Sequence, residues 1–124
     1  MVHSNNKNTG ALGEKIALNY LLSMNYELIT SNYSTRFGEI DLIMRDKDVL
    51  VFVEVKTKKG LGWGRPEEMF TRNKYRKVKN MATVYLEGRE VKSRIDMVAV
   101  VLGQDNEPVS VKYYENVTGM DNSQ

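Results

Sequence analysis

Four charged residues interrupt two hydrophobic segments of the sequence. The first segment carries Glu39 and Asp41 at alternate positions, and the second carries Glu54 and Lys56 with the same spacing. Residues two apart in an extended chain point to the same side, so each pair shares one face of its strand. Burying an unpaired charge is very costly, so these side chains must be paired, solvated at a strand end or bound to a cation.

Two carboxylates on neighbouring strands predict a site for a divalent cation. Adjacent strands lie about 4.8 Å apart, so Asp41 and Glu54 can converge, where they repel each other unless a proton or a metal lies between them. Mg²⁺ often takes one or two carboxylates and keeps waters for a phosphate substrate. Such a metal would activate water against a phosphodiester, and Lys56 would orient that water or stabilise the developing charge. The structural alternative is a salt bridge between Glu54 and Lys56.

The elements that position these residues follow from hydrophobic spacing and turn signals. A helix with Thr9 as its N-cap is expected first. Pro66 suits either a helix start or a loop end, and a long helix is expected after it, ending near Glu87 with Gly88 as its C′ residue. Strands are expected around them, the first three as an antiparallel meander, and a Gly-rich basic loop covers residues 58–65. The expected ranges are a helix over 10–24, strands over 26–33, 38–45 and 49–57, a helix to 87, and strands over 94–102 and 109–114.

Alternation within the strands predicts which side chains share a face. On the second strand Glu39, Asp41 and Ile43 are expected on one face and Ile40, Leu42 and Met44 on the other. On the third strand Leu50, Phe52, Glu54 and Lys56 are expected to oppose Val51, Val53 and Val55. The order αβββαββ indicates an α/β fold, a central mixed five-stranded sheet flanked by helices.

Each helix contributes one further candidate. On the first helix, the residues expected to face the core are Gly13, Ala17, Tyr20, Leu21 and Met24, and Glu14 lies at the edge of that face. Lys74 falls inside the apolar stripe of the second helix, formed by Thr71, Tyr75, Val78, Met81, Ala82 and Tyr85. Glu14 either supports the carboxylates or lies on a solvated flank. Lys74 either reaches the site or packs its stem on the core with its ammonium in water.

Composition bounds the remaining possibilities. The 124 residues fit one domain, expected over residues 9–116, with flexible tails at 1–8 and 117–124. There is no cysteine, and the single histidine, His3, lies in the first tail, so a zinc hydrolase or a histidine triad is very unfavourable. No apolar run approaches the roughly 20 residues of a membrane span, and no secretory signal is present. We therefore expect a cytoplasmic protein without a membrane partner.

Basic residues cluster after the third strand, although the net charge is only +2. Between Lys56 and Lys79 the only acids are Glu67 and Glu68. The candidates for contacts with phosphate are Lys58, Lys59, Arg65, Arg72, Lys74, Arg76 and Lys77. Trp63 in the Gly-rich loop would either stack on a base or dock on its own core. Asp96, which follows Arg94 on a strand, is expected to pair with a nearby cation, with support of the site as the alternative.

The two strand motifs together resemble a known family. Gly38-Glu39-Ile40-Asp41-Leu42-Ile43 followed by Phe52-Val53-Glu54-Val55-Lys56-Thr57 resembles the YraN-like family of bacterial proteins, which is endonuclease-related. That family is similar in turn to archaeal Holliday-junction resolvases and to the PD-(D/E)XK nuclease superfamily. The resemblance covers about residues 10–115 and includes the Gly-x-x-Gly-Glu start of the first helix. It departs from the superfamily pattern at Ile40, where the namesake proline would stand.

The resemblance implies a restriction-endonuclease-like fold and a role for each site residue. Asp41 would be the lone acidic metal ligand, Glu54 and Lys56 the Glu-x-Lys pair, and the Val55 carbonyl a further ligand. Glu14 would replace the acidic residue that resolvases carry on their first helix, and Glu39 would support Asp41. The implied cofactor is Mg²⁺, with Mn²⁺ as an alternative, and the implied substrate is structured or branched DNA. Resolvases work as dimers, which leaves a homodimer open.

Three functional hypotheses remain distinct at this point. The first is a metal-dependent nuclease that hydrolyses phosphodiester bonds in DNA. The second is a nucleic-acid-binding module of the same fold with little or no cleavage, which would bind without metal and weaken strongly with salt. The third is a protein-interaction adaptor, which would show no affinity for DNA at physiological salt and no dependence on Lys56.

Overall fold

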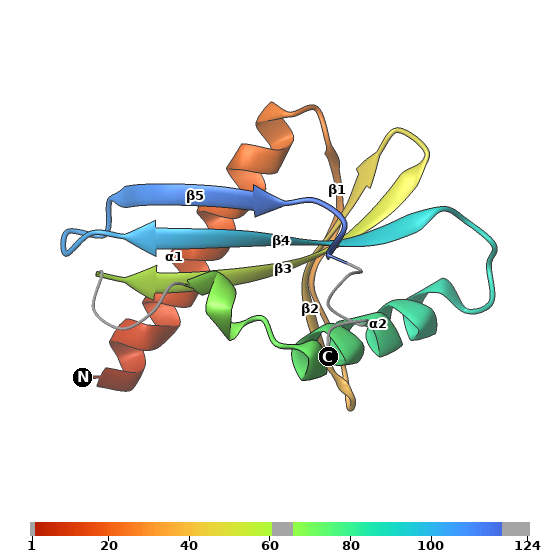
Figure 1. Ribbon diagram of the computed structural model, residues 1–124, viewed down its shortest axis with the longest axis horizontal. Coiled ribbons are helices and arrows are strands. Elements are labelled where there is room, and N and C mark those ends of the chain that lie inside the picture. Colours follow the sequence, from red (N-terminus) through yellow and green to blue (C-terminus); the bar gives the residue numbers. More distant parts are fainter. Residues whose placement is uncertain (1, 61–65, 118–124) are drawn as a thin grey trace.

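The computed structural model describes residues 2–60 and 66–117, apart from the side chains of residues 2–7, 67 and 69. A five-stranded mixed sheet has the strand order β1-β2-β3-β4-β5, with only β3 and β4 parallel to each other. Its elements follow the predicted order αβββαββ, with a short 3₁₀ helix, η1, before α2 (Figure 1). Their bounds are α1 Val2–Ser23, β1 Glu27–Thr35, β2 Gly38–Asp46, β3 Val49–Lys59, η1 Pro66–Met69, α2 Arg72–Leu86, β4 Ser93–Leu102 and β5 Pro108–Tyr114.

Each helix covers one face of the sheet (Figure 1). On one side Ala17 and Leu21 of α1 pack on the valines of β3 that the alternation placed together, and on the other side Val78 and Met81 of α2 pack on Phe52. The opposite faces predicted for β3 are therefore confirmed. Neither helix within the described residues is long and apolar enough to cross a membrane.

The predicted start of the first helix needs correction. Helix α1 begins at Val2, so it includes residues 2–8, which were expected to be a tail, and Thr9 lies within it instead of capping it. Tyr20 and Met24, expected on its buried face, are 38% and 39% exposed, because the core contacts are made by Ala17 and Leu21. Pro66 begins a helix, one of the two roles predicted for it, and the long helix follows after its N-cap, Thr71.

A close approach between α1 and β3 depends on Gly13. A side chain added there would place its Cβ 1.8 Å from the Thr57 Oγ1 atom and 2.8 Å from the Thr57 Cβ atom. The helix therefore lies directly against the strand that carries the Glu-x-Lys pair, and the next residue, Glu14, is brought to the same end of the sheet.

Gly13→Ala should lower the free energy of unfolding by about 1–3 kcal/mol, since the helix must move away from β3 to accommodate the methyl group. Gly10→Ala is the matched control, because nothing lies within 4 Å of the Cβ position at Gly10, so the gain in helix propensity should raise stability by about 0.5–1 kcal/mol. Urea denaturation of both variants measures the difference. Equal effects at the two positions would contradict the close contact.

Strand β2 bends at Asp41, and this overturns one predicted face. Pairing between β2 and β3 runs from Asp46↔Val49 to Leu42↔Val53 and then stops. Beyond that point Ile40 packs in the same cluster as Ile43, on the α2 side, instead of sharing a face with Leu42. The alternation is broken because the strands separate where the charged residues begin.

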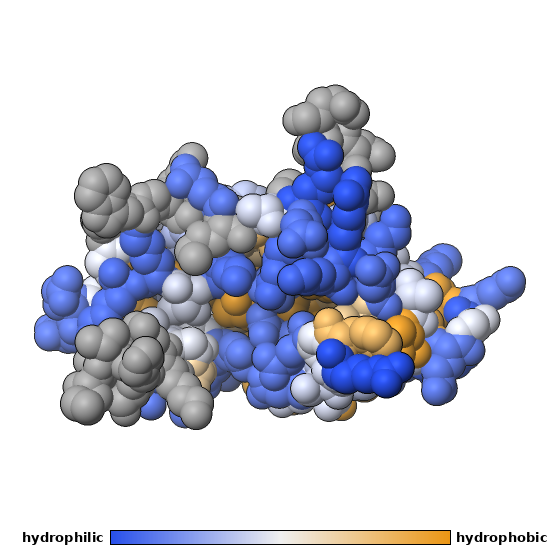
Figure 2. Space-filling view, turned by 90° about the horizontal axis from the view of Figure 1, so that it is seen from below, coloured by the Kyte–Doolittle hydropathy of each residue, from blue (hydrophilic) through white to orange (hydrophobic). Residues whose placement is uncertain are grey.

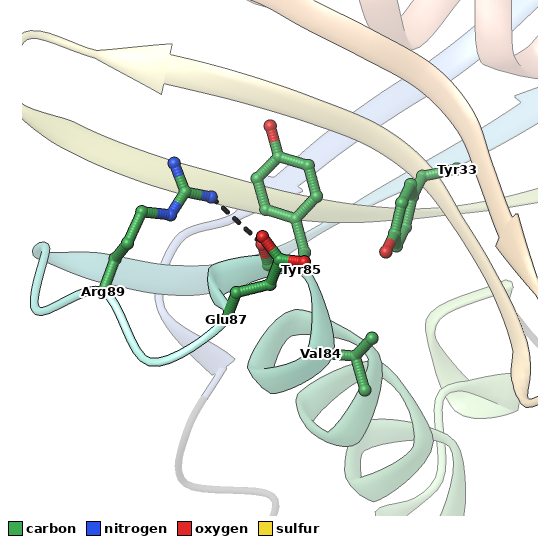
Figure 3. Close-up of a pocket in the computed structure, with 5 residues that line it drawn as sticks. All are labelled: Tyr33, Val84, Tyr85, Glu87 and Arg89. Carbon is green, nitrogen blue, oxygen red and sulfur yellow. Dashed lines mark hydrogen bonds between the residues drawn. The ribbon is translucent and has the colours of Figure 1, made fainter.

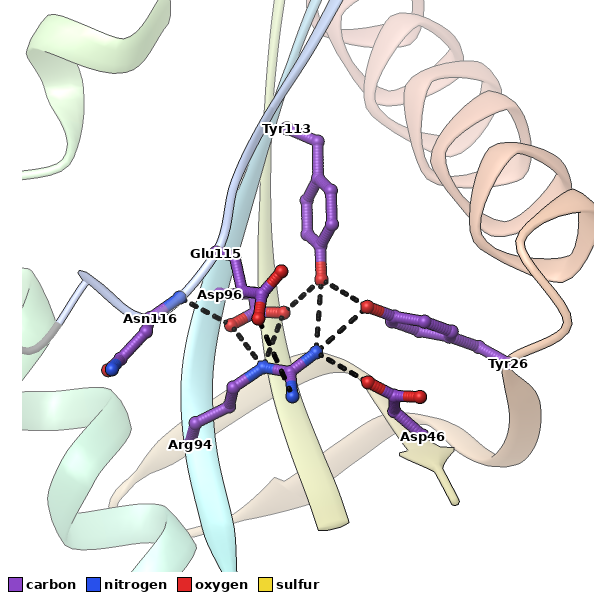
Figure 4. A network of polar contacts seen from close by, with 7 residues as sticks. All are labelled: Tyr26, Asp46, Arg94, Asp96, Tyr113, Glu115 and Asn116. Carbon is purple, nitrogen blue, oxygen red and sulfur yellow. Dashed lines mark hydrogen bonds and ion pairs between the residues drawn. The ribbon is translucent and has the colours of Figure 1, made fainter.

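A buried polar network joins β4 to β2 and β5 (Figure 4). Asp96 is fully buried and accepts hydrogen bonds from Arg94 Nε at 3.1 and 3.2 Å, from the Tyr113 hydroxyl, and from the backbone N–H of Asn116 at 2.8 Å. Arg94 also contacts Asp46 at the end of β2. The prediction that Asp96 pairs with a nearby cation is confirmed.

The network keeps its protonation states fixed. Although burial acts in the opposite direction, hydrogen bonding to Tyr113 and the charge of Asp96 raise the pKa of the Arg94 guanidinium. Burial and the hydrogen bond to Asp96 raise the pKa of the Tyr113 hydroxyl. Arg94 thus stays charged and Tyr113 stays neutral across the ordinary pH range. The network therefore has a structural role, which is to hold β2, β4 and β5 together.

Candidate metal centre

Asp41 and Glu54 converge where β2 and β3 separate. The Asp41 Oδ2 atom accepts a hydrogen bond from the backbone N–H of Val55 at 2.7 Å, in place of the ladder bond that would have continued the sheet. Glu54 precedes Val55 on β3, and its side chain is only 3% exposed. The carboxylate of one strand is thus fixed against the backbone of the next, beside a second, buried carboxylate.

The two carboxylates cannot both be charged without strong repulsion. Burial and the neighbouring Glu54 carboxylate raise the pKa of Asp41 from its ordinary value of 3.8 to about 7, although the Val55 N–H acts in the opposite direction. In the absence of a cation, the pair therefore retains a proton up to neutral pH. A divalent cation could replace that proton and relieve the same repulsion.

Glu14 reaches this pair from helix α1. Burial raises its pKa from 4.5 to about 7, and the charges of Asp41 and Glu39 add to that shift. Glu39 is exposed and lies two residues before Asp41 on β2. The structure thus brings together all three acidic residues that the sequence analysis placed around Glu54.

Two lysines meet the buried carboxylate of Glu54. The Lys56 Nζ atom lies 3.5 Å from Glu54 Oε2, and the Lys74 Nζ atom lies 3.3 Å from the same oxygen. The salt bridge considered as the structural alternative is therefore present. It does not account for Asp41, because burial and the Glu54 carboxylate raise the pKa of that carboxyl while the Val55 N–H donates a hydrogen bond to it.

The donor set fits a hard cation that keeps several waters. Among the described residues, no group of three or more acidic or histidine side chains is placed to hold a metal on its own. The candidate ligands are the carboxylates of Asp41 and Glu54, the second of which is paired with two lysines. The Val55 N–H that faces Asp41 indicates that the Val55 carbonyl is directed to the same edge of β3. One or two carboxylates with a carbonyl and water match Mg²⁺ better than zinc.

The residues predicted to contact nucleic acid fall on two elements that meet at this centre. Lys58 and Lys59 continue β3 beyond Lys56, and the remaining described candidates, Arg72, Arg76 and Lys77, lie on α2 with Lys74. Lys59, Arg76 and Lys77 are exposed, whereas Lys58 and Arg72 are half-buried. Arg65 and Trp63 lie outside the described residues, as does the part of the predicted second tail from residue 118 on.

A hollow at the far end of α2 does not share this chemistry (Figure 3). It has a volume of about 420 Å³ and is lined by Tyr33, Val84, Tyr85, Glu87 and Arg89. Arg89 folds back on the helix end, where its Nε atom donates to the Leu86 carbonyl at 2.9 Å and its Nη2 atom to the Tyr85 carbonyl at 3.0 Å. Its guanidinium therefore satisfies carbonyl groups at the end of the helix, and the carboxylate cluster remains the better candidate site.

Asn32 is a site residue that the sequence analysis missed. It lies in the middle of β1 with a left-handed backbone, φ 53°, opposite the point where β2 bends, and its side chain hydrogen-bonds Glu14. Asparagine is depleted in strands but tolerates this conformation better than other residues with a side chain. An asparagine inside an otherwise β-forming run was the signal that could have revealed it.

Comparison with known proteins places the chain among a group of bacterial proteins of undefined activity. A family model described as uncharacterised protein family UPF0102 matches residues 13–100. A UPF0102 protein of Dictyoglomus turgidum is 35% identical over 115 residues, covering 90% of this chain and 98% of the relative. One of Rhodococcus jostii is 42% identical over 102 residues, covering 80% and 86%, and one of Clostridium botulinum is 35% identical over 119 residues, covering 93% and 97%. The matched segment includes Glu14, Asp41, Glu54, Lys56 and Lys74.

Proposed function

The chain belongs to the uncharacterised protein family UPF0102, and from that premise we propose that it is a divalent-metal-dependent nuclease of DNA. The observation that carries the proposal is the convergence of Asp41 with buried Glu54 beside Lys56, at the point where two strands separate. We further propose that the fold is restriction-endonuclease-like and the site of the PD-(D/E)XK type. The crossover from β3 through α2 to parallel β4, with the Glu-x-Lys pair on the central strand, supports that assignment.

Each residue of the proposed site has a separate chemical role. Asp41 and Glu54 would hold Mg²⁺, with Mn²⁺ as the alternative, through carboxylate oxygens and Val55 through its carbonyl. The metal would polarise the phosphate and lower the pKa of an attacking water. Lys56 would donate hydrogen bonds from Nζ to the oxygen on which negative charge develops. Glu14, whose pKa of about 7 lies near neutral pH, would accept a proton. Glu39 would support the site through its negative charge, which helps to raise the pKa of Glu14.

DNA as the substrate is supported by the placement of the basic residues. Lys58 and Lys59 lead away from the carboxylates along β3, and Arg72, Arg76 and Lys77 lead away along α2. Phosphates on both sides of the bond to be cut would thus meet cations, which position the backbone without reading the sequence. The preference for branched or structured DNA, and a homodimer that cuts two strands, are proposals that rest on the resemblance to resolvases.

A cleavage panel tests the proposal. Linear, nicked, flapped and four-way DNA of one sequence is incubated with the protein and Mg²⁺ or Mn²⁺, and products are resolved on denaturing gels. We expect cutting that requires the metal and disappears in Asp41→Ala protein that remains folded. Failure of well-folded wild-type protein to cut any of these substrates would rule the proposal out.

A nucleic-acid-binding module without turnover is the second candidate, and one observation favours it. Lys56 and Lys74 already neutralise Glu54, so they compete with a metal for its carboxylate. This candidate predicts binding without metal that weakens steeply with salt, and no cutting anywhere in the panel.

Metal binding should strengthen as the pH rises through 7. The folded-state pKa values of Asp41 and Glu14 are raised to about 7 from 3.8 and 4.5, so the folded protein holds protons that the unfolded chain releases. Their contribution to stability is therefore present below about pH 4 and is lost as the pH rises through 7. A metal must displace those protons, so Mg²⁺ should raise the melting temperature more at pH 8.5 than at pH 5.5. Thermal denaturation with and without Mg²⁺ measures this, and a shift independent of pH would contradict it.

A further inference from the structure

The turn between β1 and β2 presents an aromatic side chain to solvent beside the candidate metal centre. Phe37 is 63% exposed, more than any other large hydrophobic residue within the described ranges. The guanidinium carbon of Arg36 lies 5.0 Å from the centre of its ring. Two residues later comes Glu39, whose charge acts on Glu14 and Asp41. At about 3.3 Å per residue, a strand places Phe37 no more than about 13 Å from Asp41.

Helix α2 holds this turn in place. The Thr35 Oγ1 atom accepts a hydrogen bond from the Phe37 N–H at 3.0 Å and donates one to the Met81 Sδ atom at 3.2 Å. Two residues before Thr35 on β1, the ring of Tyr33 meets the ring of Tyr85 edge to face, with centroids 5.2 Å apart. In Figure 1 the tip of the β1–β2 hairpin accordingly lies beside α2. A ligand that contacts Phe37 would thus meet a side chain on a supported turn, so little ordering is needed on binding.

The size of the exposed surface argues against a protein partner. One phenylalanine side chain offers on the order of 150–250 Å², whereas a stable protein interface buries about 1,000 Å² or more. The flanking residues are Arg36 and Gly38, and the face seen in Figure 2 is largely hydrophilic, with one distinct hydrophobic patch and smaller hydrophobic areas. A single planar ring with an arginine against it matches one nucleobase and its phosphate instead.

We propose that Phe37, together with Arg36, stacks on an unpaired base of the DNA substrate close to the bond to be cut. The inference rests on the proposed function and specifies its substrate class. A span of about 13 Å corresponds to about four stacked nucleotides, so the contacted base lies within that distance of the bond. Bases in a continuous duplex are already stacked on both sides, so the contact selects DNA with unpaired bases, such as flaps and junctions.

Binding of two matched DNA probes tests the inference. A fluorescein-labelled duplex with a single-stranded flap and a continuous duplex of the same charge are titrated in Ca²⁺, with fluorescence anisotropy as the readout. We expect the wild type to prefer the flap. Phe37→Ala should weaken flap binding about tenfold, the effect of removing one base stack, and change duplex binding less than twofold. Phe37→Trp should retain the preference, and Val109→Ala, at a residue 60% exposed on β5, should change neither affinity.

A parallel cleavage assay in Mg²⁺ separates this inference from the proposed function. If Phe37→Ala binds both probes like the wild type while the wild type cuts DNA, base stacking by Phe37 is wrong and the nuclease assignment stands. If Phe37→Ala loses the flap preference but the wild type cuts nothing, the stacking contact stands and the nuclease assignment is wrong. An equal loss on both probes, or a wild type without any preference for the flap, overturns the stacking contact.

Discussion

Asp41→Asn should reduce metal-dependent DNA cleavage at least a thousandfold while leaving the metal-free protein as stable as the wild type or more stable. The neutral amide is a poor ligand for a divalent cation, whose stabilisation of transition-state charge is worth several kcal/mol, and about 4 kcal/mol corresponds to roughly a thousandfold in rate. The amide oxygen can still accept the Val55 N–H, and the variant removes both the buried charge and its repulsion with Glu54, the two causes that raise the pKa of Asp41 to about 7. Single-turnover cleavage and urea denaturation in a chelating buffer at pH 8 measure the two effects.

This combination separates a functional carboxylate from a structural one. If Asp41 served only to hold β2 against β3, Asp41→Asn, which keeps an acceptor for the Val55 N–H, would leave both stability and cleavage close to wild type. Glu90→Gln is the matched control, because Glu90 is an exposed carboxylate on the connection between α2 and β4. It should change neither rate nor stability. Near-wild-type cutting by Asp41→Asn would exclude Asp41 as a metal ligand.

Asp96→Ala should lower the free energy of unfolding by about 3–5 kcal/mol, a large share of the 5–15 kcal/mol that holds a typical domain together. The variant leaves Arg94, only 13% exposed, without the carboxylate that contacts its Nε atom, and leaves the backbone N–H of Asn116 without its acceptor. Three strands lose a shared anchor, since Arg94, Asp46 and Tyr113 lie on β4, β2 and β5. Chemical denaturation measures the loss.

Glu115→Ala provides the comparison within the same network. Its carboxylate lies 3.9 Å from Arg94 Nη1 and is 59% exposed, so solvent screens the interaction and the change should stay within about 0.5 kcal/mol. Similar losses of unfolding free energy in the two variants would mean that the burial of Asp96 is not what makes its contribution to stability large.

Much of the fold could be predicted because the chain is locally consistent. Val51, Val53 and Val55 alternate with Phe52 and Glu54, and this period of two assigns both faces of β3. The prediction failed at Ile40, because β2 leaves its pairing with β3 beyond Leu42 and Asp41 contacts the backbone of β3 there, which local alternation does not contain. The early start of α1 was also not predicted, because residues 2–8 carry no hydrophobic period.

Some contacts of the candidate site could also be predicted from the sequence, and others could not. The convergence of Asp41 with Glu54 could be predicted because adjacent strands have a fixed spacing. The contact of Lys74 with Glu54 is in keeping with its place in the apolar stripe of α2. Asn32 could not be placed, because its left-handed backbone and its contact with Glu14 depend on how β1 follows the bend in β2. Phe37 had no periodicity to mark it, since it lies in a turn.

Anomalous diffraction from crystals soaked in Mn²⁺ tests the central claim most directly, because it locates the cation without requiring a correct DNA substrate. The account predicts one strong Mn²⁺ peak between the carboxylates of Asp41 and Glu54, beside the carbonyl of Val55, with Lys56 and Lys74 displaced from the contacts that they make with Glu54. The peak should be lost in crystals of Asp41→Asn. A wild-type crystal with the two lysines still on Glu54 and no Mn²⁺ between the carboxylates would contradict the account.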